Sequence, residues 1–140
     1  ADEEAPDLLF DFATLTGAAR VAMGPDLPPF YCNDDDLATA IAHHGTVVND
    51  PVWRLPLWQP YDSLIDGKVG DINNIANGPF AGSIIAALFL QRFIGQAKAW
   101  AHFDIFGWTP AAKPGHPEGG EAQTARLLFD LLEQRFGRTT

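Results

Sequence analysis

Two ionisable residues late in the chain, His102 and Asp104, have types and spacing that could serve chemistry. Residues two apart in an extended segment point to the same face of a strand, so an imidazole and a carboxylate would lie together. Such a pair could begin a metal site, but no third or fourth ligand follows at a recognisable spacing. Because buried polar groups are nearly always hydrogen-bonded, we expect His102 and Asp104 to bond each other or loop backbone.

The other reactive side chains have structural interpretations that compete with catalysis. Cys32 is the only cysteine, which excludes an internal disulfide, and the acidic residues at 34–36 favour an inert thiol over a nucleophile. His43 and His44 end a predicted helix, where an imidazole complements the helix dipole. The two acids of "PEGGE" (117–121) suit a loop and the start of the next helix better than general acid–base catalysis.

Asparagines gather in "DINNIANG" (71–78), where Asn73, Asn74 and Asn77 could fix a tight loop through their own backbone. The same amides could instead hold a substrate or a neighbouring loop, and the structural role is favoured. No nucleophile elbow, dinucleotide-binding glycine motif or phosphate-binding loop is present. Residue chemistry alone therefore predicts no complete catalytic constellation.

Length and charge bound the class of protein. The 140 residues suit one domain, and 46% hydrophobic residues are enough for a core. A net charge of −9 argues against nucleic acid and anionic membrane surfaces as partners. The longest apolar run, "IIAALFL", is far shorter than the roughly 20 residues of a membrane-spanning helix. The start "ADEEAPD" lacks an initiator Met and is typical of the tail of a helix, which indicates a piece of a larger chain.

Patterning predicts strands that alternate with helices, which is typical of a layered α/β domain. The helix beginning after Pro79 is apolar almost all round, so we expect it to be buried, with Gly82 allowing another element close. We expect a largely buried strand at 8–15 and a second strand at 99–106. We expect helices at 16–24, from Asn33 or Asp34 to Gly45, from Pro79 to Gly95 and over 121–137. We expect a helical turn at 61–65 and loops at 67–82 and 107–120.

Alternation assigns faces to the last two elements. In the 99–106 strand, one face should carry Ala101, Phe103 and Ile105, and the other Trp100, His102, Asp104 and Phe106. The last helix should turn its core side through Leu128, Leu131, Leu132 and Phe136 and end at Gly137.

Four stretches together resemble one family. They are "DFATLTGAA", "VWRLPLWQPYDSLIDGKVGDINNIANGPFAGSIIAALFLQRFI", "WAHFDIFGW" and "GGEAQTARLLFDLLEQRF". In this order they are similar to the C-terminal part of the leucyl aminopeptidases, the cytosol aminopeptidases of peptidase family M17. The likeness runs along nearly all of residues 1–140, and the ordered motifs A-T-L-T-G, D-I-N-N-I and W-A-H-x-D-I are jointly specific.

The resemblance implies an α/β fold in which a mixed sheet is flanked by helices, as the C-terminal portion of a larger catalytic domain. Members of the family are cytoplasmic, usually assemble as hexamers and remove N-terminal residues from peptide substrates. They use two divalent metal ions, zinc or manganese, which suits the activation of a water and the polarisation of a carbonyl.

The family's metal ligands lie upstream, in a segment with lysine and aspartate and in an N-T-D-A-E-G-R motif, and neither is in this sequence. The resemblance thus implies that this chain supplies pocket wall and core, binds no metal through its own ligands and is inactive alone. The alternative is a non-catalytic binding or assembly module that keeps the fold. In either case a divided sheet domain exposes an edge, so we expect self-association or pairing with the missing part.

The resemblance also assigns substrate-binding positions. Backbone groups of Thr14 and Leu15 could bond the substrate, and Gly17 allows close approach because it lacks a Cβ. Phe106 stands where many members of the family have alanine, so it should shrink the pocket for the first residue of the substrate and redirect specificity away from leucine. The complete set of matching positions is Thr14, Leu15, Gly17, Ile75, Phe106 and Thr109.

Overall fold

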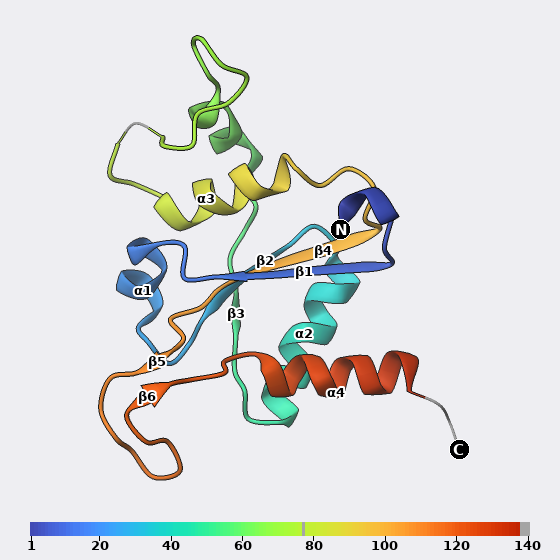
Figure 1. Ribbon diagram of the computed structural model, residues 1–140, viewed down its shortest axis with the longest axis vertical. Coiled ribbons are helices and arrows are strands. Elements are labelled where there is room, and N and C mark those ends of the chain that lie inside the picture. Colours follow the sequence, from blue (N-terminus) through green and yellow to red (C-terminus); the bar gives the residue numbers. More distant parts are fainter. Residues whose placement is uncertain (77, 138–140) are drawn as a thin grey trace.

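A mixed sheet of four strands organises the chain, as a computed structural model shows for residues 1–76 and 78–137 (Figure 1). The order is β1 (Leu8–Ala13), β4 (Ala99–Asp104), β2 (Pro29–Cys32) and β3 (Trp53–Arg54). β1 runs parallel to β4, whereas β2 runs antiparallel to β4 and parallel to β3. A two-stranded hairpin, β5 (Trp108–Thr109) with β6 (Gly119–Gly120), lies apart from this sheet.

Helices cover both faces of the sheet. Helix α2 (Asp35–Val47) packs against α4 (Ala125–Phe136) on one side, and α3 (Gly82–Gln91) packs with the 3₁₀ helix η2 (Gln59–Ile65) on the other (Figure 1). A short α1 (Gly17–Met23) follows β1, and η1 (Asp2–Glu4) opens the chain. The predicted fold class, a mixed sheet flanked by helices, is confirmed. No helix among the described residues has the length and apolar character needed to cross a membrane.

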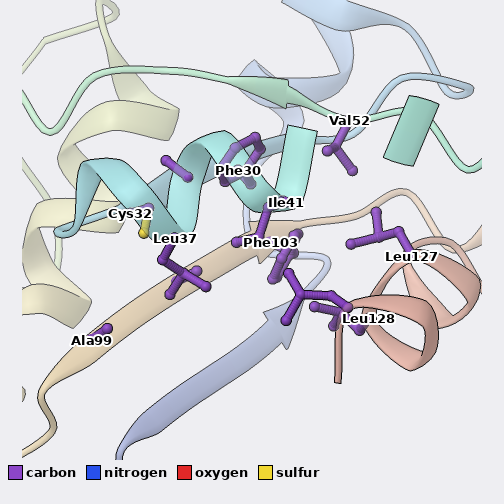
Figure 2. Close-up of a cluster of buried hydrophobic side chains, with 12 residues drawn as sticks. Phe30, Cys32, Leu37, Ile41, Val52, Ala99, Phe103, Leu127 and Leu128 are labelled. Atoms are coloured by element: carbon purple, nitrogen blue, oxygen red, sulfur yellow. The ribbon is translucent and has the colours of Figure 1, made fainter. Parts of the chain in front are cut away.

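The main core lies between the sheet and the pair α2 and α4. Phe103 of the fully buried β4 stacks on Phe30 of β2 at a centroid distance of 5.8 Å. Figure 2 shows Leu37 and Ile41 of α2 and Leu128 of α4 converging on these rings. β4 and β2 are buried along their whole length because each has a strand on either side.

The edge position of β1 corrects one expectation. Its residues are mostly half-buried, and Phe12 is 47% exposed, so the strand is not largely buried. β1 has β4 on one side and no strand on the other among the described residues. Its interior polar residue, Asp11, accepts from Trp100 Nε1 at 2.6 Å, which explains why a carboxylate interrupts the apolar run.

Gly45 does not end α2, contrary to the prediction. The helix begins after Asp34, whose side chain accepts from the Leu37 amide at 2.7 Å, as predicted, and it continues to Val47. A Cβ on Gly45 would lie 2.9 Å from the Asp50 carbonyl oxygen. The glycine thus serves a close approach between helix and loop, which the sequence pattern does not distinguish from a helix stop.

The predicted limits of α3 were also too wide. The helix begins at Gly82 rather than after Pro79, because Ala81 has a left-handed backbone (φ 55°), and it ends at Gln91 rather than near Gly95. The expected close approach at Gly82 is confirmed, since a Cβ there would lie 3.3 Å from Ala18 Cβ of α1.

Helix α4 begins at Ala125 rather than at 121 and turns a different side to the core. Its buried residues are Leu127, Leu128 and Leu131. Leu132 and Phe136 are 38% and 57% exposed, so their assignment to the core side was wrong. The predicted end at Gly137 is confirmed, as its amide donates to the Glu133 carbonyl.

Candidate functional site

Three segments meet at one end of the sheet and enclose a cavity of about 340 Å³. Because β1 and β4 are parallel, their carboxyl ends lie at the same edge of the sheet. The antiparallel β2 starts there, with Phe30 opposite Phe103. The residues that follow β1 and β4 and those at the start of β2 therefore wall one space. Its lining includes Thr14, Thr16, Gly17, Arg20, Pro28, Pro29, Asp104, Ile105 and Phe106.

The carboxylate of Asp104 anchors the segment after β1. Its Oδ1 accepts from the amides of Leu15 at 3.0 Å and Thr16 at 3.3 Å, and its Oδ2 accepts from Thr16 Oγ1 at 2.7 Å. The same hydroxyl accepts from the Ala19 amide at 3.1 Å and so caps α1. Because one buried carboxylate satisfies two loop amides, the Thr14–Gly17 backbone is held in a single arrangement.

A hydroxyl pair extends this network toward α3. Ser83 Oγ donates to Asp104 Oδ2 at 3.2 Å, and the Tyr31 hydroxyl donates to Ser83 Oγ at 2.6 Å. Burial raises the pKa of Tyr31 to about 12, so its hydroxyl keeps its proton at neutral pH. β2, α3 and β4 are thereby joined behind the cavity wall.

The opposite wall is the segment after β4. Gln123 Oε1 accepts from the amides of Phe106 and Gly107, both at 3.0 Å, and Gln123 Nε2 donates to the Pro25 carbonyl at 2.7 Å. Gly107 has φ +66°, and a Cβ there would lie 3.8 Å from Thr14 Cγ2, so the two walls come close at this point. The Arg20 guanidinium lies over the half-buried Phe106 ring, with Cζ 4.9 Å from the ring centroid.

The structure distributes the predicted substrate-binding residues over three cavities. Thr14, Gly17 and Phe106 line the cavity at the sheet end. Leu15 and Ile75 line a more apolar cavity of about 430 Å³ between α3 and the 74–80 segment. Thr16 lines both, so the two cavities are neighbours.

Thr109 belongs to a third cavity of about 190 Å³. It is buried, and its hydroxyl donates to Glu121 Oε2 at 2.9 Å. His116 Nδ1 lies 3.0 Å from the same oxygen. These contacts with His116 and Thr109 lower the pKa of Glu121. The acid therefore belongs to the β5–β6 region and not to the start of a helix.

The expected pairing of His102 with Asp104 is replaced by separate partners. His102 Nδ1 lies 2.5 Å from Asp11 Oδ1, whereas Asp104 binds loop amides. The loop-backbone alternative was therefore right for Asp104 and wrong for His102. Within 1–76 and 78–137 no group of three or more His, Cys, Asp or Glu is arranged to hold a metal ion. These residues do not fit a two-metal site.

Two smaller predictions agree with the structure. Burial raises the pKa of the Cys32 thiol, and its sulfur donates to the Asp34 carbonyl at 3.1 Å, as expected of an inert thiol. Asn73 Nδ2 donates to the Asp66 carbonyl at 3.0 Å, which is a structural role for that asparagine. Asn74 lines the apolar cavity, and Asn77 lies outside the described residues.

Sequence reasoning missed four residues of the site: Arg20, Tyr31, Ser83 and Gln123. A signal for Arg20 was present, because it follows Gly17 by three residues in a predicted helix and so shares its face. No local pattern indicates the others, whose partners lie 16 to 98 positions away in sequence.

Comparisons with known proteins point to one family. A sequence model described as the cytosol aminopeptidase family, catalytic domain, matches residues 1–129. Probable cytosol aminopeptidases of Chlorobium phaeobacteroides and Rickettsia bellii are 45% and 39% identical over 92% and 94% of this chain. The chain spans about a quarter of their length, 26% and 27% respectively.

Solved structures give the same result. The crystal structure of cytosol aminopeptidase from Coxiella burnetii matches 96% of this chain with a TM-score of 0.90 and 49% identity, over 29% of its own length. The bottromycin maturation enzyme BotP, solved in complex with Mn, matches 92% of this chain and 29% of its own with a TM-score of 0.86 and 31% identity. The match of family model, sequence relatives and fold over nearly the whole chain shows that it belongs to the cytosol aminopeptidase family.

Proposed function

We propose that this chain is the part of a two-metal aminopeptidase that forms the pocket for the first residue of a peptide substrate. The observation that carries the proposal is the convergence of Thr14, Gly17 and Phe106 on one cavity at the sheet end. Clefts at the carboxyl ends of sheet strands are common ligand sites. The shape of this cavity is fixed by Asp104 on one wall and Gln123 on the other.

The reaction that we propose is hydrolysis of the N-terminal residue from a peptide. Two divalent ions, manganese or zinc, would polarise the scissile carbonyl and activate water, and their ligands would come from residues outside this chain. This chain's own role is to bind and orient the first residue. The Leu15 amide donates to Asp104, so the Leu15 carbonyl is the backbone group that could accept a hydrogen bond from the substrate amine.

The setting of the reaction is also a proposal. A family of cytosol aminopeptidases suggests a cytoplasmic enzyme that assembles as a homo-oligomer, a hexamer by resemblance. Its partner is a peptide. The net charge of −9 gives no support to nucleic acid or a membrane surface as a partner.

The test is turnover of leucine amide by the complete protein, meaning the polypeptide that carries this chain together with the upstream part of the catalytic domain. Manganese-dependent turnover that a chelator abolishes would support the proposal, as would no turnover by residues 1–140 alone. If the folded, manganese-supplied complete protein has no turnover, the non-catalytic binding or assembly module becomes the better account.

A further inference from the structure

Arg20 is a cation that faces the cavity at the sheet end without a carboxylate partner among the described residues. Four other Lys and Arg side chains do form ion pairs with carboxylates, namely Arg54, Arg92, Lys98 and Lys113. Instead, the Arg20 guanidinium lies over the Phe106 ring. In a chain of net charge −9, a cation at a cavity without a carboxylate partner can bind an anionic ligand.

The geometry of α1 directs this side chain into the cavity. Residues three apart share a helix face, and side chains tilt toward the helix N-terminus. Arg20 therefore reaches back over the turn that begins at Gly17. No atom lies within 4 Å of the position that a Cβ on Gly17 would take, so the space there is open. Phe106, from the segment after β4, holds the guanidinium at the far wall.

The other charge in the cavity, Asp104, is already satisfied. Its two oxygens accept from the amides of Leu15 and Thr16 and from the hydroxyls of Thr16 and Ser83. It is 3% exposed, so it forms the floor and meets little of the open space. Arg20 is thus the charge that a ligand in the cavity would encounter.

The remaining lining is largely apolar. Pro28 and Pro29 are buried, and Ile105 adds a further apolar surface. A cavity of about 340 Å³ falls in the usual range of ligand pockets even with the Phe106 ring in its wall.

We infer that Arg20 is a specificity residue that pairs with the side-chain carboxylate of an acidic first residue, so that the pocket prefers a glutamyl over a glutaminyl peptide. A guanidinium can bind a carboxylate through two parallel hydrogen bonds, which a neutral amide does not match. The inference rests on the proposed function, because it takes this cavity as the pocket for the first residue.

The kinetic test compares the complete protein with its Arg20→Gln variant on matched glutamyl, glutaminyl and leucyl amides. We expect the unmodified protein to favour glutamyl over glutaminyl substrate by about tenfold or more in kcat/KM. Arg20→Gln should bring the ratio of glutamyl to glutaminyl kcat/KM close to one. Arg20 is exposed at the helix surface, so the variant should fold.

The matched control is Arg135→Gln. Arg135 also lies over a phenylalanine, with Cζ 5.6 Å from the Phe136 ring centroid, but on α4. This variant changes the same charge and breaks the same kind of contact, so the glutamyl preference should remain. Arg20→Lys keeps the charge without the planar fork, and we expect an intermediate ratio.

A binding measurement separates this inference from the proposed function. Calorimetry should show L-glutamate binding the complete protein more tightly than L-glutamine, and Arg20→Gln should abolish the difference. Leucyl turnover without any glutamate preference, or a preference that survives Arg20→Gln, would overturn the role of Arg20 and leave the aminopeptidase proposal intact. If no substrate is turned over, only the aminopeptidase proposal is contradicted. The binding of L-glutamate would then still decide the role of Arg20.

Discussion

At the scale of single residues, Phe106 decides how much room the cavity offers. Phe106 lines the cavity, and its backbone amide is held by Gln123 Oε1. We predict that Phe106→Ala in the complete protein widens the preference toward bulky first residues. A difference of one methylene changes discrimination by about 1–3 kcal/mol, so removing a ring should raise kcat/KM for phenylalanyl relative to alanyl substrate by roughly tenfold or more.

The control for Phe106→Ala is Phe129→Ala, which removes a 69% exposed ring of α4 that lines none of the three cavities described above. Relative kcat/KM values for alanyl, leucyl and phenylalanyl substrates should not change in this variant. If they are also unchanged in Phe106→Ala, the ring does not face the bound first residue.

At the scale of elements, Asp104 couples the ends of two strands to a helix cap. We predict that Asp104→Asn raises KM and lowers the stability of the complete protein by about 1–3 kcal/mol, because an amide replaces the carboxylate that accepts from two backbone amides. Thermal unfolding and steady-state kinetics measure the two effects. Ser83→Ala should have a smaller effect on KM, since it removes one hydroxyl and leaves both loop amides bonded. Equal effects of the two substitutions would contradict the anchoring role of Asp104.

The packing of α2 against the loop at Asp50 depends on the absence of a side chain at Gly45. Alanine normally stabilises a helix interior by roughly 0.5–1 kcal/mol relative to glycine. Here its Cβ would lie 2.9 Å from the Asp50 carbonyl and 3.6 Å from Leu127 Cδ2. We therefore predict that Gly45→Ala destabilises the fold by about 1–3 kcal/mol, measured by chemical denaturation. The control is Thr46→Ala, at the next and exposed position, which should leave the free energy of unfolding nearly unchanged. If Gly45→Ala instead stabilises the protein, the Asp50 loop can move to accommodate the added Cβ.

Local signals were enough for most elements and insufficient for what joins them. The Asp34 cap, the strand predicted over 99–106 and the motif at Thr14–Gly17 are readable because each depends on neighbouring residues, although the strand ends at Asp104. The start of α4 was missed because its cap is remote: Asp50 accepts from the amides of Thr124, Arg126 and Leu127. The same holds for the candidate site. The resemblance identified three residues that line the cavity, Thr14, Gly17 and Phe106. The hydrogen bonds of Asp104 could not be predicted without the register between β1 and β4.

At the scale of the whole molecule, the 140-residue chain exposes apolar side chains beside α3 and one unpaired edge of the sheet. Ile75 and Phe80 at the apolar cavity are 77% and 84% exposed, and Leu15 beside them is 43% exposed. The outer edge of β1 pairs with no described strand. Contiguous apolar surface and an unpaired edge both favour association with another chain.

We therefore predict that the isolated chain self-associates in proportion to its concentration, as measured by sedimentation velocity. Phe80→Ser should weaken association if the apolar cavity is the contact, whereas the matched surface change Phe129→Ser on α4 should not. If neither substitution changes association, the next contact to test is the outer edge of β1, which pairs with no described strand. A chain that stays monomeric at high concentration would mean that the uncovered surface is compatible with water and needs no partner.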